Sequence, residues 1–174
     1  FKGTIMAILI SPMIVPLIIT SAGMFFFYSK IGLTHTYLGL ILAHTALGTP
    51  FVVITVTATL TGFDTNLIRA SQSLGADTMR TFFKVIMPLI LPGVISGGLF
   101  AFITSFDEVV VVMFVGSVEQ ITIPKQMWAG LRQETSPVIL CMATCLVALS
   151  IALLTTVELL RRRSERLRGI KHRK

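Results

Sequence analysis

Four long apolar stretches, separated by shorter polar segments, dominate the pattern of residues along the chain. They cover residues 4–27, 37–60, 89–114 and 137–160. A helix needs about 20 largely apolar residues to cross the hydrocarbon core of a bilayer, and each stretch reaches that length. The pattern predicts an all-α integral membrane protein, with a transmembrane helix bundle of four spans in residues 1–160 and a tail in residues 161–174.

Proline marks the interior or the start of several of these stretches. Pro12 and Pro16 lie inside the first stretch and Pro50 lies inside the second. Such prolines can kink a helix, and in a bundle the neighbouring helices satisfy the backbone groups that they leave free. The fourth stretch begins at Pro137 after Ser136, which predicts a serine N-cap followed by proline in the first turn.

Composition supports a membrane protein over a soluble one. Hydrophobic residues make up 53% of the 174 residues and charged residues only 13%, whereas soluble domains carry about 25% charged residues. The net charge is +7, but eight of the fifteen lysines and arginines lie in the last fourteen residues. A basic run beside an apolar span is typical of an anchor that contacts the headgroups of membrane lipids. No base-reading motif accompanies it, so we do not expect nucleic acid as a partner.

Lysine and arginine also divide unevenly between the two sides that four spans define. Twelve fall on the side of the N-terminus, the 61–88 segment and the tail, against three on the other side. Cytoplasmic segments of membrane proteins carry the excess of these residues. We therefore expect residues 61–88 and 161–174 in the cytoplasm and residues 115–136 on the opposite side.

The polar segment between the second and third spans has a helical pattern of its own. Its apolar residues follow a spacing of three and four, at Met79, Phe82, Phe83 and Ile86. This spacing predicts an amphipathic helix at the membrane surface, with Asp77 as its N-cap. A second short helix precedes it, with Asp64 or Thr65 as its cap, and Gly75 lies between the two, where a chain reversal favours glycine. An interfacial connector without a partner would show the same pattern.

The stretch "RASQSLGADTMRTFFKVIMPLILPG", residues 69–93, resembles the signature loop of ATP-binding-cassette (ABC) importer permeases. In that family a Glu-Ala-Ala triplet precedes Leu-Gly-Ala, an aromatic and basic helix, and two prolines. The Leu-Gly-Ala of this chain and both prolines match, while Arg69 stands where the family has its glutamate. The flanking stretches "THTYLGLILAHTALGTPFVVITVTATLTGFD" and "SFDEVVVVMFVGS" resemble the spermidine/putrescine branch of the same family.

This resemblance implies a type I importer permease in the bacterial inner membrane, with the four spans as the last four of six. It implies that the 64–87 segment couples transport of a polyamine or related amine to an ATPase. The resemblance also implies three protein partners: a dimer of ATP-binding subunits that holds ATP and Mg²⁺, a second, different permease, and an extracytoplasmic solute-binding protein. The coupling residues that it implies are Arg69, Ala70, Ser71, Leu74, Gly75, Ala76 and Asp77. The candidates that it implies for docking the solute-binding protein are Trp128, Arg132 and Glu134.

Two adjacent acids, Asp107 and Glu108, fall inside the third predicted span. A charged side chain at the centre of a bilayer costs about 2.5–3.5 kcal/mol on insertion scales, so acids in a span call for an explanation. Small residues on the same helix follow a spacing of three and four, which predicts close packing of that face against another helix. We expect both acids, with Thr104 and Phe106, to line a path for an organic cation, which carboxylates and ring faces attract. Two acids near the outer interface, without a role in transport, remain the alternative.

Several other functions are disfavoured by what the sequence lacks. It contains no phosphate-binding G-x-x-x-x-G-K-[ST] motif and no nucleophile–base constellation, so we expect neither an enzyme nor a cofactor on this chain. Cys141 and Cys145 lie in an apolar run without histidine or acidic neighbours, which favours packing over a metal site. The rival function is an ion-coupled transporter or channel with Asp107 and Glu108 in a cation path. A passive membrane anchor is a third and weaker alternative.

Overall fold

The computed structural model describes residues 1–133 and 137–167, and these ranges are helical without any strand. The helices are α1 (Lys2–Ile14), α2 (Leu17–Lys30), α3 (Tyr37–Thr61), α4 (Asn66–Ser73), α5 (Thr78–Thr81), the π-helix η1 (Phe82–Ile86), α6 (Met87–Phe106), α7 (Val110–Val115), α8 (Ile123–Gln133) and α9 (Pro137–Leu167). The prediction of an all-α membrane protein is confirmed.

Among the described residues, three helical runs are long and apolar enough to cross a membrane. They are Tyr37–Thr61, Thr78–Phe106 and Pro137–Thr156. A fourth span is present if α1 and α2, which are bent by 110° at the break between them, together count as one. α9 begins at Pro137 as expected, while its predicted cap, Ser136, lies outside the described residues.

The first predicted span, residues 4–27, is not one straight helix, and the kink that its prolines predict is present. The chain breaks at Val15 and Pro16, and Val15 is extended, with φ −75° and ψ 135°. The ring of a proline disfavours the helical conformation of the residue before it, and Val15 is in that position. Pro12 has the same chemistry yet lies inside α1. The result is two short helices at a steep angle instead of one straight span.

The third predicted span, residues 89–114, is also wrong in its bounds. The helical run begins earlier, at Thr78, and ends at Phe106, just before the two acids. The π-helix η1 joins α5 to α6 within this run, and such wider turns commonly mark bends in a helix. The valines that follow the acids form a separate short helix, α7, and do not extend the span.

Helices α3 and α6 form the central pair of the molecule, and glycine lets them approach closely. A Cβ atom built on Gly48 would lie 2.9 Å from the Cβ atom of Ala101, and one built on Gly97 would lie 2.7 Å from the Cα atom of Val52. On the same face, Gly93 lies against Thr59. The small-residue face that the sequence predicts is therefore the α3–α6 interface.

A compact apolar core lies beside this pair, where α7 packs between α2 and α3. Val111, Val112 and Val115 of α7 are fully buried. They pack with Tyr28 of α2 and with residues of α3 such as Leu47. α7 is thus apolar because it fills a protein core.

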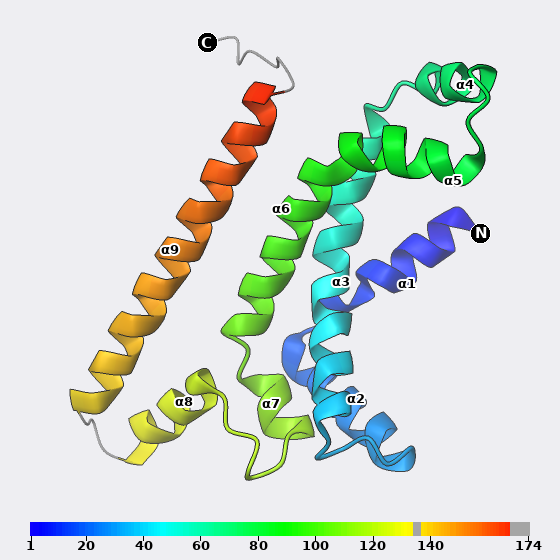
Figure 1. Ribbon diagram of the computed structural model, residues 1–174. Coiled ribbons are helices and arrows are strands. Elements are labelled where there is room, and N and C mark those ends of the chain that lie inside the picture. Colours follow the sequence, from blue (N-terminus) through cyan, green and yellow to red (C-terminus); the bar gives the residue numbers. More distant parts are fainter. Residues whose placement is uncertain (134–136, 168–174) are drawn as a thin grey trace.

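The two ends of the bundle carry different elements, as Figure 1 shows. The α4–α5 segment and the C-terminal end of α9 lie at one end, and α7, α8 and the start of α9 lie at the other. α9 leans away from the central pair, and no residue of its most apolar stretch is buried within the chain. The predicted topology requires the α4–α5 segment and the end of α9 to share one end of the bundle, as they do, while the side of the membrane that this end faces stays a prediction.

Candidate functional site

The α4–α5 segment is a compact, glycine-hinged turn. Gly75 has a φ of +82°, a conformation that residues with a Cβ rarely adopt. Asp77 caps α5, because its carboxylate accepts a 2.7 Å hydrogen bond from the backbone N–H of Arg80. The hydroxyls of Ser71 and Thr81 lie 3.0 Å apart and share a hydrogen bond between the two helices, and Thr81 is buried. These contacts give the turn one defined shape, with both expectations about Gly75 and Asp77 confirmed.

The same turn presents an apolar and basic surface to the outside. Leu74 is 89% exposed, and Met79 and Phe83 are also exposed. Gly75 and Asp77 line a surface hollow of about 470 Å³ together with Arg80 and Lys84. Of the other residues that the resemblance selects here, Arg69 and Ala70 are exposed and Ser71 and Ala76 are half-buried. A fixed shape with exposed apolar side chains is typical of a docking surface.

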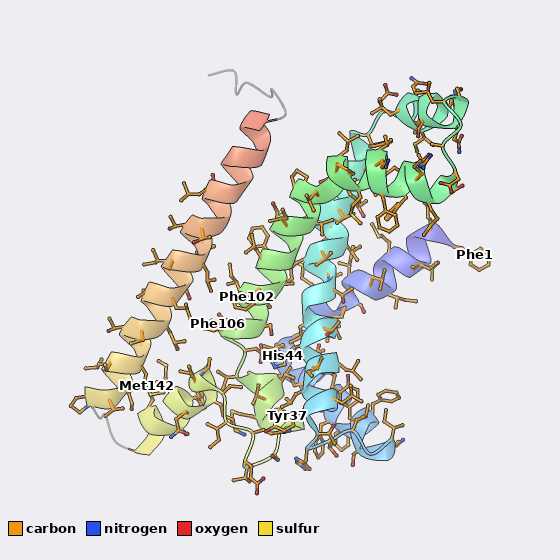
Figure 2. The ribbon with its side chains drawn as sticks, viewed as in Figure 1. Phe1, Tyr37, His44, Phe102, Phe106 and Met142 are labelled. Atoms are coloured by element: carbon orange, nitrogen blue, oxygen red, sulfur yellow. The ribbon has the colours of Figure 1, made fainter. Side chains whose placement is uncertain are left out.

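A larger cavity of about 980 Å³ lies toward the opposite end of the molecule. Its walls come from α3, from the second half of α6, from residues 119–122 of the connection between α7 and α8, and from the start of α8. Figure 2 labels four of the side chains that line it: Tyr37 and His44 on α3, and Phe102 and Phe106 on α6. The volume is in the range of small-molecule sites, about 300–1,000 Å³.

The polar groups of this cavity are partly committed to other contacts. His44 Nδ1 lies 2.8 Å from Ser105 Oγ, and this hydrogen bond ties α3 to α6. Thr45 and Thr49 donate their hydroxyls to carbonyls of their own helix. On the α6 side, the rings of Phe102 and Phe106 stack with centroids 5.5 Å apart. The cavity is thus mostly apolar and aromatic, with few polar groups left for a ligand.

The structure separates the four residues that the sequence placed on one path. Phe106 lines the large cavity, and it also lines a smaller one of about 210 Å³ in which Asp107 and residues of α9 take part. Glu108 lines neither of these cavities and is only 7% exposed. Its carboxylate accepts a 2.8 Å hydrogen bond from the backbone N–H of Val111 and so caps α7. Thr104 is half-buried in α6 and lines neither cavity.

Of the candidate docking residues for a solute-binding protein, Trp128 is the one whose side chain the structure describes, and it belongs to α8, at the end opposite α4. The side chain of Trp128 is 47% exposed. The side chain of Arg132 and the whole of Glu134 lie outside the described residues. Sequence reasoning missed the connection between α7 and α8, where Glu119 and Gln120 line the cavity. The sequence signal that could have indicated it is an acid–amide pair a few residues after an apolar run.

Comparison with known proteins decides the family. The family described as "Binding-protein-dependent transport system inner membrane component" matches residues 1–166. The chain belongs to this family. It is accordingly a multi-pass protein of the bacterial inner membrane, and the resemblance stated from its loop motif is confirmed.

Individual relatives point to the same branch of the family. The spermidine/putrescine transport system permease protein PotC of Haemophilus influenzae is 31% identical over 163 residues, covering 94% of this chain and 63% of the relative. PotC of Escherichia coli K12 is 29% identical, covering 92% of this chain and 61% of the relative. The putrescine permease PotI of the same organism is 28% identical, covering 79% of this chain and 51% of the relative. The chain therefore spans less than two thirds of the length of these relatives.

A solved structure supports the fold. A chain of the MetNI methionine ABC transporter, in an inward-facing conformation, matches with a TM-score of 0.73 and 22% sequence identity. The match covers 93% of this chain and 73% of that chain. The arrangement of helices described above is therefore that of an ABC importer permease.

Proposed function

We propose that the chain is part of the permease subunit of an ABC importer and forms part of the translocation path for an organic cation of the polyamine class. ATP hydrolysis on a partner subunit drives the import. The observation that carries the proposal is one continuous helical run, Thr78–Phe106, which begins in the exposed turn and ends in the wall of the cavity. A displacement of the turn is therefore transmitted along a single helix to the cavity.

The exposed turn is the contact for the ATP-binding subunits in this proposal. Leu74 is exposed on it, and Arg69 lies five residues earlier, on α4. Gly75, Asp77 and the Ser71–Thr81 hydrogen bond keep the turn stiff, so that it moves as a unit when the partner closes. ATP and Mg²⁺ are held by the dimer of partner subunits.

The cavity is the substrate path in this proposal. Stacked rings and few free polar groups favour a ligand with methylene segments and a cationic end, because ring faces attract cations. The relatives named as polyamine permeases support the same substrate class. Phe106 and Asp107 are proposed on the path because they line cavities at the end of α6. Glu108 and Thr104, which line neither, are proposed to shape it.

The other partners are proposed from the family. A second, different permease subunit completes the path, and an extracytoplasmic solute-binding protein delivers substrate near Trp128. Arg132 and Glu134 belong to the same proposed docking face.

The test is reconstitution of the whole permease with its ATPase, partner permease and solute-binding protein in proteoliposomes. We expect uptake of labelled spermidine that requires ATP hydrolysis and the solute-binding protein. Methionine and a phosphonate serve as controls and should not be taken up. Uptake driven by an ion gradient without nucleotide would instead favour the ion-coupled transporter. Uptake of methionine with no uptake of spermidine would refute the substrate class and leave the ABC mechanism intact.

A further inference from the structure

The connection between α7 and α8 is held in one conformation by its own side chains. The backbone N–H of Ser117 donates a 2.9 Å hydrogen bond to Gln120 Oε1, and the backbone N–H of Gln120 donates a 3.2 Å bond to Ser117 Oγ. Lys125 then reaches back from α8, and its Nζ donates to the carbonyl oxygens of Ser117 (2.9 Å) and Gln120 (3.2 Å). The backbone on both sides of Glu119 is therefore fixed.

A second set of contacts ties this connection to the rest of the bundle. The backbone N–H of His35, before α3, donates a 2.8 Å hydrogen bond to the carbonyl oxygen of Val115. His35 Nδ1 also lies 3.1 Å from the carbonyl oxygen of Gly116. Because Val115 belongs to the buried core, the connection is attached to the most rigid part of the molecule.

These contacts leave the carboxylate of Glu119 without a protein partner among the described residues. Lys125, the nearest cation along the chain, uses its ammonium on two backbone carbonyls. Of the described residues that line the large cavity, Glu119 is the one with a carboxylate. The same cavity contains the phenol of Tyr37 and the stacked rings of Phe102 and Phe106. An acid on a fixed backbone beside aromatic surfaces is the arrangement that binds an ammonium group.

We propose that Glu119 is the anionic recognition group at the outer mouth of the cavity, where it binds the ammonium end of an organic cation while the Phe102–Phe106 stack contacts the rest of the molecule. This inference rests on the proposed function, since it names the residue that selects the substrate class. The assignment shifts charge recognition away from Glu108, whose carboxylate caps α7. It also shifts it away from Asp107, which lines only the smaller cavity.

The test is equilibrium binding of labelled spermidine to the assembled permease–ATPase complex without the solute-binding protein. Glu119→Gln removes the charge and keeps the shape, and Glu119→Asp is the matched control that keeps the charge. Because Glu119 is exposed and partly screened by solvent, we expect Glu119→Gln to weaken binding by about two- to tenfold, and Glu119→Asp by less than about twofold. The difference should shrink in about 0.5 M salt, which screens exposed charges.

Each other outcome has a defined meaning. Three results would overturn the inference. Equal binding by wild type and Glu119→Gln would show that Glu119 is a solvated surface acid. Equal loss of binding in both variants, or a loss that salt does not change, would show a structural role. Uptake of spermidine by the complete transporter, without measurable binding by the complex alone, would also overturn it while leaving the proposed function standing. A transporter that neither binds nor imports spermidine would overturn both the substrate class and this site.

Discussion

The packing of α6 on α3 gives a sharp prediction, because two adjacent glycines have opposite surroundings. A Cβ atom on Gly97 would lie 2.7 Å from the Cα atom of Val52 and 3.2 Å from the carbonyl oxygen of Phe51, both of which are backbone atoms. A Cβ atom on Gly98 would meet nothing within 4 Å. Gly97→Ala and Gly98→Ala therefore make the same chemical change one residue apart, with only one of them inside the helix interface.

The expected difference in stability between the two variants follows from two opposing effects. Alanine stabilises a helix interior by about 0.5–1 kcal/mol relative to glycine, and this gain applies equally to both variants. Only Gly97→Ala also forces two backbones apart, and inserting a methyl group into a packed interface costs about 1–3 kcal/mol. Gly98→Ala should therefore be neutral or slightly stabilising. Gly97→Ala should be less stable than Gly98→Ala by about 1–3 kcal/mol, which is roughly 5- to 150-fold in the folding equilibrium.

The assay is equilibrium unfolding of the purified permease by sodium dodecyl sulfate in mixed micelles, followed by far-ultraviolet circular dichroism. A third variant, Gly97→Ala with Thr55→Ala, separates side-chain from backbone crowding. Thr55 Oγ1 is the atom nearest to the added methyl group, but the contact with Val52 remains when it is removed, so we expect only partial recovery. Equal stability of Gly97→Ala and Gly98→Ala would refute close packing of α3 and α6 at this point.

The remaining predictions concern the turn, the topology and the acids. Gly75→Val should uncouple ATP hydrolysis from uptake or release the ATPase, because a β-branched residue is strained at a φ of +82°. The control Gly75→Asn should retain most of the coupling, and normal uptake by Gly75→Val would contradict the prediction. In a variant without native cysteines, an impermeant thiol reagent added from outside should label Val118→Cys and not Leu74→Cys, although both positions are 89% exposed; labelling of both would refute the topology. In the same detergent titration, Glu108→Ala should lower the free energy of unfolding by about 1–2 kcal/mol, because α7 loses its cap. Asp107→Ala should lower it by less than about 0.5 kcal/mol. Equal losses in the two variants would argue against the cap.

The parts of the fold that the sequence predicts well are those in which one physical requirement acts alone. α3 and α9 are long apolar helices bounded by polar segments, and their starts agree with the predicted spans at Tyr37 and Pro137. The conformation of Gly75 and the cap at Asp77 follow from local backbone chemistry and were also predictable. The side of the membrane on which each polar segment lies stays a prediction, which rests on the distribution of lysine and arginine.

The sequence is less informative where two options look alike along the chain. It predicts that Pro12 and Pro16 can kink the first span, but it does not distinguish them, and only Pro16 lies at a break between helices. The valines of α7 are as apolar as a membrane span, but they are apolar because α2 and α3 cover them. Hydropathy does not distinguish burial by lipid from burial by protein, so the residues of α7 look like a continuation of the third span.

The two adjacent acids show how a buried charge can influence a site that it does not line. The Glu108 carboxylate holds the first turn of α7, and α7 ends at Val115, whose carbonyl oxygen accepts the hydrogen bond from His35. Two residues later, Ser117 begins the hydrogen-bonded connection between α7 and α8 that holds Glu119 at the cavity. Loss of the Glu108 cap would thus loosen the connection and disturb the cavity mouth without removing any group from the lining. An acid in an apolar run is therefore weak evidence for a substrate contact until its hydrogen-bond partners are known, and here those partners assign Glu108 to positioning and leave Glu119 for recognition.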